Sequence, residues 1–130
     1  MPVALHPATS EDAPVLERLL ELHQHDLSTF TPAVLDEAGR FGYPYLGLYW
    51  TEADRHALLI RADGHLAGFA LVNTHTLLDG SDRSLAEFFV ARPFRRTGVG
   101  REAASAVCRR FPGRWEIRVQ EANAPAHAFW

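Results

Sequence analysis

The chain has 130 residues, 47% of them hydrophobic and 22% charged, which suits one compact domain, so we expect a single domain over residues 1–130. A net charge of −3 gives no reason to expect a nucleic-acid or anionic-membrane partner, and no stretch approaches the roughly 20 apolar residues that span a bilayer. The single cysteine excludes an internal disulfide and every multi-cysteine metal site, and with no secretory signal in the first residues we expect a cytoplasmic protein.

The first half of the chain predicts a strand, a helix and an irregular segment. Residues 3–5 are a short apolar run, and Thr-Ser-Glu-Asp at 9–12 offers a capping box for a helix with an apolar face at helical spacing. Residues 27–50 show poor periodicity with frequent proline and glycine, although residues 32–38 fit a short second helix. The irregular segment is dense in aromatic residues, namely Phe41, Tyr43, Tyr45, Tyr49 and Trp50.

The second half predicts three antiparallel strands, a helix, a strand and a last helix. Apolar runs at 56–62 and 66–74 flank Asp63-Gly64, whose residues tolerate the positive φ angles of a tight hairpin turn. Another turn precedes a strand at 84–90, and an arginine and glycine stretch then leads into a helix that begins near Val99 and ends before Pro112-Gly113. The expected last strand covers residues 115–119, and the last helix begins at 123 and continues to 130.

The stretch before the helix at Val99 predicts an anion-binding loop. The first N–H groups of a helix have no partner inside the helix and carry about half a positive charge, so they attract anions. Gly98 and Gly100 leave this backbone open to a phosphate. Nearby arginines add full charges whose guanidinium groups match phosphate oxygens. A pyrophosphate is the natural ligand of such a loop.

Arg95-x-x-Gly98-x-Gly100, between a strand and a helix, resembles the acyl-CoA pyrophosphate loop of the GNAT superfamily of N-acetyltransferases. The order of the predicted elements is similar to the superfamily's from end to end. Three further stretches are also similar: residues 5–9 with Asp12, Phe88-Phe89-Val90, and Asn123-x-x-Ala126-x-x-Phe129-Trp130. The resemblance implies an α/β (α+β) fold with a mixed, mostly antiparallel sheet flanked by helices. It also implies acetyl-CoA as co-substrate, between the strand before the loop and the strand after it, and a small-molecule or peptide amine as acceptor.

The resemblance also implies the residues that bind the cofactor. The main chain of Phe89 and Val90 would hold the pantetheine arm and polarise the thioester carbonyl. Asn123 matches a family residue that often contacts the pantetheine, although a role as a helix cap explains it equally well. The expected diphosphate site consists of Arg95, Arg96, Thr97, Gly98, Val99, Gly100 and Arg101.

Direct attack of an amine on the thioester, which the resemblance implies, needs a neutral amine, a donor for the oxyanion and a proton for the leaving thiolate. Glu87 is the carboxylate nearest to the expected splay of its strand and is a candidate base; pairing with a loop arginine or a solvent-facing position explains it equally well. His75, near the end of the preceding strand, is a second candidate. Many family members have a tyrosine in the final helix as the acid, and here Trp130 takes that position.

Tyr43, Tyr45 and Tyr49 lie in the region that walls the acceptor site in this superfamily. Tyrosine rings bind a cationic amine by cation–π contact, so we expect them to line the acceptor pocket; packing beside the sheet is the alternative.

Two other groups of reactive residues have simpler explanations. Cys108 lies near the apolar face of the helix after the loop, which predicts a small core residue rather than a nucleophile. His23 and His25, with Asp26, are spaced so that the two histidines point to different sides of a helix, so we expect no metal.

The same glycines also fit a dinucleotide-binding fingerprint, Gly98-x-Gly100-x-x-Ala103, with Glu121 at the expected distance. A Rossmann turn follows its strand at once and opens a parallel βαβ unit, whereas here an arginine-rich stretch intervenes and an antiparallel hairpin comes first. The sequence therefore favours the acyl-CoA loop.

The superfamily normally continues past its final helix with two more strands, and this sequence ends at Trp130. The expectation is a shortened chain, a sheet completed by another chain, or an exposed edge that invites a homodimer. Two functions remain: an N-acetyltransferase for a primary amine, or a non-catalytic acyl-CoA-binding or regulatory module.

Overall fold

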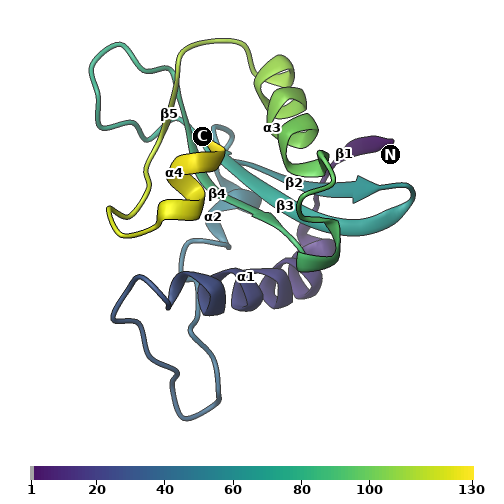
Figure 1. Ribbon diagram of the computed structural model, residues 1–130. Helices are drawn as coiled ribbons and strands as arrows, with labels where there is room; N and C mark the ends of the chain where they lie inside the picture. The colour runs from purple at the N-terminus through teal and green to yellow at the C-terminus, as the bar shows by residue number, and fades with distance from the viewer. Residues whose placement is uncertain (1) are drawn as a thin grey trace.

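The computed structural model describes residues 2–130 and shows helices packed on a central sheet (Figure 1). In chain order the elements are β1 (Val3–Pro7), the 3₁₀ turn η1 (Ser10–Asp12), α1 (Ala13–Leu27), α2 (Leu48–Thr51), β2 (His56–Ala62), β3 (His65–Asn73), β4 (Arg83–Val90), the 3₁₀ turn η2 (Arg92–Phe94), α3 (Val99–Arg110), β5 (Trp115–Ile117) and α4 (Ala124–Phe129).

The five strands lie in the order β1-β2-β3-β4-β5, and every neighbouring pair is antiparallel except β4 and β5, which are parallel. Helix α1 covers one face of the sheet and α3 the other (Figure 1). The predicted α/β fold with a mostly antiparallel sheet is therefore confirmed. The dinucleotide fingerprint is excluded, because the glycine turn follows an antiparallel strand and is separated from it by η2.

Two apolar cores fix the helices against the sheet. Leu16 and Leu20 of α1 pack against Phe69 and Phe89, while Val99, with two further α3 residues at helical spacing, packs on the opposite face. Burying each of these side chains contributes about 1.5–3 kcal/mol, which is enough to hold both helices in place. As a result, the C-terminal half of α1 and the first turn of α3 both lie near the C-terminal end of β4.

Strand β4 has a free edge over its second half. Leu71 of β3 pairs with Glu87, and the next residue of β3 pairs with Leu85, so Ala86 is an extra, bulged residue in β4. On its other side β4 pairs with β5 only over residues 83–85. Beyond Leu85 the two parallel strands separate, which explains why β5 ends at Ile117 rather than at the predicted 119.

Most local predictions hold, and the hairpin between β2 and β3 is the clearest case. Asp63 and Gly64 have φ angles of 53° and 81°, so both turn residues adopt the left-handed conformation that their sequence predicts. At the start of η1, which leads into α1, the Asp12 carboxylate accepts a hydrogen bond from the Thr9 backbone N–H at 2.9 Å, as the capping box predicts.

The predicted helix over residues 32–38 is wrong. The segment consists of turns and irregular chain, and Val34 is 80% exposed, so its apolar side chains have no surface on which to bury a helical face. The Asp36 carboxylate instead accepts hydrogen bonds from the backbone N–H groups of Ala38 and Arg40, both at 2.9 Å. Such local bonds stabilise a turn at the expense of a helix.

The predicted core position of Cys108 is also wrong, because its side chain is exposed. The buried face of α3 consists of Val99, Ala103 and Val107. Cys108 comes directly after Val107, and successive side chains of an α-helix are about 100° apart, so Cys108 points away from that face. Partial burial still raises the pKa of the Cys108 thiol, which opposes a nucleophilic role.

Among residues 2–130, no helix combines the length and apolar character that crossing a membrane requires. Strands β1 and β5 are the two edges of the sheet, and association of two copies through an edge stays a prediction.

Candidate active site

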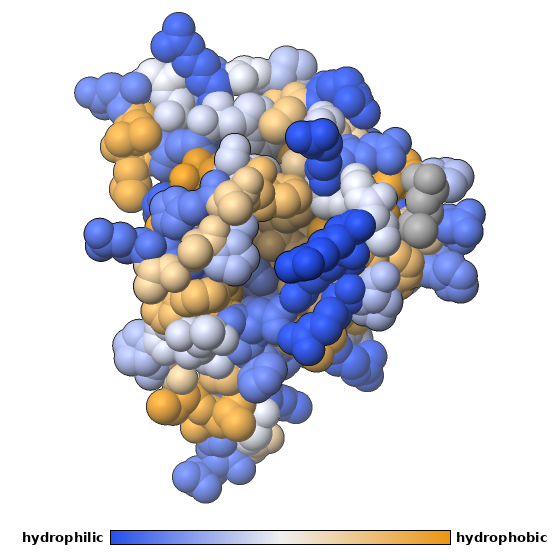
Figure 2. Space-filling model, viewed as in Figure 1, coloured by the Kyte–Doolittle hydropathy of each residue, from blue (hydrophilic) through white to orange (hydrophobic). Residues whose placement is uncertain are grey.

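Two cavities open beside the free edge of β4. The larger, of about 800 Å³, lies between β4, the turn before α3, and α4, and the smaller, of about 540 Å³, lies between α1, β4 and the segment after β5. Figure 2 shows a hollow beside α4 with hydrophobic side chains in it and strongly hydrophilic ones on its border. The cavities meet, since four of the described residues line both: His23, Phe88, Ala126 and Trp130.

The larger cavity contains the first turn of α3. Gly98 adopts a φ of 86° immediately before the helix, and its carbonyl accepts the N–H of Glu102 at 3.0 Å. The N–H groups of Val99, Gly100 and Arg101 precede this first helical bond and have no partner within the helix. Val99 has its side chain buried in the core, so only its main chain is available to a ligand. This helix start has the free N–H groups that attract anions, and binding of a diphosphate to it stays a prediction.

The arginines of the loop have different roles. Arg95 is already engaged: its Nε donates to the Val90 carbonyl at 2.8 Å, a terminal nitrogen donates to the Asp26 carboxylate of α1 at 2.5 Å, and its guanidinium lies over the Phe89 ring. It therefore ties the loop to β4 and α1. Arg96 and Arg101 are exposed, line the larger cavity and remain the better candidates for phosphate contacts.

Thr97 does not line the larger cavity, although it belongs to the predicted diphosphate site. Its hydroxyl donates to the Phe94 carbonyl, which holds the turn after η2. Sequence spacing alone could not show this contact, because it depends on the path of the chain between Phe94 and Gly98.

The main-chain groups on the free edge of β4 belong to Phe88 and Val90. The Phe89 carbonyl points at Gly68 of β3, and the Ala91 N–H donates to a β3 carbonyl at 2.7 Å, so residues 89 and 91 face the sheet. Because backbone groups alternate along a strand, residues 88 and 90 face outwards. The prediction for Val90 fits this geometry, whereas Phe89 turns its main chain away from the groove, and Phe88 takes that place.

Aromatic rings close the gap between β4 and α4. Phe88 stacks on Phe129 with ring centroids 6.0 Å apart and meets Trp130 edge-on at 5.3 Å. Trp130 lies where the two cavities join. No tyrosine lines the larger cavity in the described part of the chain. Asn123 caps α4, because its side chain accepts the Ala126 N–H at 3.1 Å, and it lines the smaller cavity.

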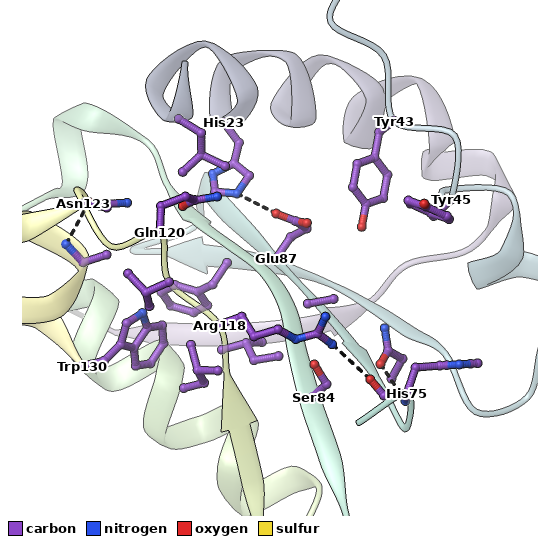
Figure 3. Close-up of a pocket in the computed structure, with 18 of the residues that line it drawn as sticks. His23, Tyr43, Tyr45, His75, Ser84, Glu87, Arg118, Gln120, Asn123 and Trp130 are labelled. Atoms are coloured by element: carbon purple, nitrogen blue, oxygen red, sulfur yellow. Dashed lines mark hydrogen bonds and ion pairs between the residues drawn. The ribbon is translucent and has the colours of Figure 1, made fainter. Parts of the chain in front are cut away.

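Glu87 and His23 form a pair inside the smaller cavity (Figure 3). His23 Nε2 lies 3.0 Å from Glu87 Oε1, and the two side chains are only 12% and 23% exposed. The His23 ring also lies edge-on to the rings of Phe69 and Phe89, each at 5.7 Å between centroids. These contacts fix the imidazole, and a carboxylate held by a fixed imidazole suits proton transfer.

The partner of Glu87 is thus His23 rather than a loop arginine, and sequence reasoning did not find this pair. One signal was present: Leu16, Leu20, His23 and Leu27 recur at helical spacing on the buried face of α1. A histidine on that face must point at the sheet. His23 and His25 point to different sides of the helix, which argued against a shared metal site. The same geometry implies that one of the two histidines faces inwards.

Two of the three predicted tyrosines line the smaller cavity. Tyr43 and Tyr45 meet edge-on at 5.6 Å, and both stand opposite Glu87 in Figure 3. Burial, and then the charge of the nearby Glu87, raise the pKa of the Tyr43 phenol, so Tyr43 is a neutral hydrogen-bonding group. Tyr49 does not line the cavity, contrary to the prediction. It lies in the core with 6% exposure, and its hydroxyl accepts a hydrogen bond from Asn73 at 3.2 Å.

His75 lines the same cavity as Glu87. Its Nε2 lies 3.4 Å from the Asp54 carboxylate, and its backbone carbonyl accepts a hydrogen bond from Arg118 at 3.1 Å. The structure also gathers Asp54, Glu52 and His75 so closely that one ligand atom from each lies within 4.8 Å of the others. Arg55 donates to Glu52 at 2.8 Å, and Thr74 donates to Asp54 at 2.7 Å, so these oxygens already have protein partners.

A model of the acetyltransferase (GNAT) family matches residues 16–130. Among solved structures, an acetyltransferase from Thermus thermophilus is 19% identical, with a TM-score of 0.77 over 99% of this chain and 83% of that one. AAC(6')-Iy in complex with the bisubstrate analogue CoA-S-monomethyl-acetylneamine is 17% identical, with a TM-score of 0.64 over 99% and 87% of the two chains. An aminoglycoside acetyltransferase from an uncultured soil metagenomic sample, in complex with sisomicin, is 10% identical, with a TM-score of 0.68 over 98% and 84%.

At these identities the solved structures establish the fold alone: a mixed α/β acyl-CoA N-acyltransferase fold. No protein with a curated description matches the chain significantly in sequence. The family match covers most of the chain, and the protein belongs to the GNAT acetyltransferase family.

Proposed function

We propose that the protein is an N-acetyltransferase that transfers the acetyl group of acetyl-CoA to a primary amine. One observation carries this proposal: a helix start with free N–H groups, the free edge of β4, and the Glu87–His23 pair follow one another along two connected cavities. A diphosphate at the first of these and an amine at the last would bring thioester and nucleophile together beside β4.

The donor would extend along the larger cavity. Its diphosphate would accept hydrogen bonds from the main chain at the start of α3, with Arg96 and Arg101 adding charge. The outward-facing groups of Phe88 and Val90 would bind the pantetheine arm and donate to the thioester carbonyl. The Val90 carbonyl already accepts a hydrogen bond from Arg95, so the N–H of Val90 is the better candidate donor to the oxyanion.

The acceptor would enter through the smaller cavity. Glu87, positioned by His23, would take a proton from the ammonium group, directly or through a water molecule. The amine nitrogen then attacks the thioester carbon and loses its second proton to water. The C–S bond breaks as the tetrahedral intermediate collapses to the amide, and the thiolate takes a proton from water. Among the described residues that line the larger cavity there is no tyrosine to supply that last proton.

The direct test is release of free thiol from acetyl-CoA when a library of amines is supplied. Replacing Glu87 by Gln (E87Q) removes the base but keeps a side chain of the same shape, so we expect kcat to fall about 100-fold or more while CoA binding is retained. Replacing Glu11 by Gln is the matched control, because Glu11 is exposed and lines neither cavity, and it should leave kcat unchanged. Normal turnover by the Glu87 variant would show that this assignment of the base is wrong.

A non-catalytic acyl-CoA-binding module is the second candidate, and the presence of Trp130 where many relatives have a tyrosine favours it. Both functions predict CoA binding, measured by calorimetry or by a thermal shift. Only the enzyme releases thiol in an amine-dependent way, so CoA binding with no turnover across the library would favour the module.

A further inference from the structure

The smaller cavity has different chemistry at its two sides. The Glu87–His23 pair lies close to α1, whereas Arg118 and His75 lie on the side away from that helix (Figure 3). Among the described lining residues Glu87 is the one carboxylate, and the arginines are Arg118 and Arg55. An acceptor whose amine lies at Glu87 would therefore have the rest of its structure facing cations.

Glu116, the carboxylate paired with Arg118, does not line the cavity. Glu116 is 6% exposed, and its two oxygens accept the backbone N–H groups of Leu77 and Leu78 at 2.8 and 3.0 Å. These two hydrogen bonds lower the pKa of Glu116 and keep it ionised. Its nearest approach to Arg118 Nε is 3.7 Å, which is longer than a hydrogen bond. Glu116 therefore orients Arg118 without occupying its donors.

Arg118 still has donors for a ligand. One terminal nitrogen donates to the His75 carbonyl at 3.1 Å, which holds the guanidinium across the cavity, and the side chain remains 56% exposed. A guanidinium has five N–H donors in a planar fork that matches a carboxylate. By contrast, Arg55 is 11% exposed and donates to the Glu52 carboxylate at 2.8 Å, so its charge already has a partner and Arg118 is the better site for an anion.

We propose that the acceptor is a small amine that also carries a carboxylate, an amino acid or a close analogue. Its carboxylate binds Arg118 beside His75, and its amine lies at Glu87. This inference rests on the proposed function. A cavity of about 540 Å³ matches a small molecule in size. A polycation such as an aminoglycoside fits less well, because its additional ammonium groups would face the charge of Arg118.

The experiment compares matched acceptors in the thiol-release assay. Each α- or ω-amino acid is supplied beside its amide and beside a diamine of the same length. We expect the kcat/KM of the amino acid to be at least about tenfold above that of its amide and that of the diamine. This is the size of effect that one charge-assisted hydrogen-bond pair supplies. A preference for the amide or the diamine overturns the proposal.

The variant Arg118→Gln tests the residue itself. It should raise KM for the carboxylate compound about tenfold or more while leaving KM for the amide and the affinity for CoA unchanged. Arg109→Gln, an exposed arginine in the last turn of α3, is the matched control and should change neither KM. Equal loss with all acceptors would indicate a structural role for Arg118 and contradict the proposal.

A binding measurement separates this inference from the proposed function. The same compounds are titrated into the protein saturated with CoA. If no amine is turned over but the carboxylate compounds bind and Arg118→Gln abolishes that binding, the acetyltransferase proposal fails and the carboxylate site stands. If turnover occurs without any preference for a carboxylate, the site proposal alone fails.

Discussion

His56, at the start of β2, connects local packing to the pH dependence of stability. Its ring lies 4.7 Å from the ring of Phe111, between centroids, and Arg83 lies nearby. Burial, and then the positive charge of Arg83, lower the pKa of His56 below its ordinary value of about 6.5. The unfolded chain therefore binds a proton at His56 more readily than the folded protein does.

The sign of the effect follows from this difference. His56 favours the folded state above the unfolded pKa, and that contribution is lost as the pH falls through the lower folded pKa. We expect the free energy of unfolding of His56→Gln to fall less than that of the wild type between about pH 7.5 and about pH 5. Urea unfolding over this range measures it, with the exposed His65→Gln as control. Parallel curves for wild type and His56→Gln would contradict the assignment.

Gly68 is the residue on which the close packing of β3 against β4 depends. A Cβ built on Gly68 would lie 1.9 Å from the Phe89 carbonyl oxygen and 3.1 Å from the Val90 Cα. These are backbone atoms of the strand that carries the groove edge, so they cannot rotate away as a side chain could. We expect Gly68→Ala to destabilise the fold by about 2 kcal/mol or more, the usual cost of overpacking a core.

The same change should also displace the outward-facing edge of β4 and weaken CoA binding, which calorimetry on the folded variant measures. Gly47→Ala is the matched control. Gly47 has an ordinary helical φ of −58° and no atom within 4 Å of an added Cβ, so alanine there should be neutral or stabilising by up to about 1 kcal/mol. Equal stability of the two alanine variants would show that β4 accommodates the extra methyl group.

The elements themselves were largely predictable from sequence because their signals are local. The Asp63-Gly64 turn and the spacing of Val99, Ala103 and Val107 depend on neighbours a few residues away. Helical spacing could show that His23 faces the sheet, but its contact with Glu87 spans 64 residues, so no local pattern could name Glu87 as the partner. The bulge at Ala86 also escaped prediction, since it depends on the register of β4 against β3, and it decides which main-chain groups face the groove.

The whole molecule separates its charges in a way that the net value of −3 does not show. The larger cavity is lined by Arg92, Arg95, Arg96 and Arg101, and among the described lining residues Asp26 is the one carboxylate, held by Arg95. An acidic protein with a basic groove attracts a multivalent anion to one place on its surface. A long-range attraction of this kind between exposed charges is screened by salt.

Binding of CoA should therefore weaken as sodium chloride is raised from about 50 mM to about 500 mM, over which the Debye length falls from about 14 Å to about 4 Å. Removing both exposed charges, in Arg96→Gln with Arg101→Gln, should lower the affinity at low salt by about tenfold and flatten the dependence on salt. Arg109→Gln removes one charge from the far end of α3 and should leave the slope nearly unchanged. If the double variant keeps the salt dependence of the wild type, the two arginines do not recognise the phosphates and the main chain at the start of α3 does. The N–H dipoles there are fixed by the fold and act only over the short distance of a hydrogen bond.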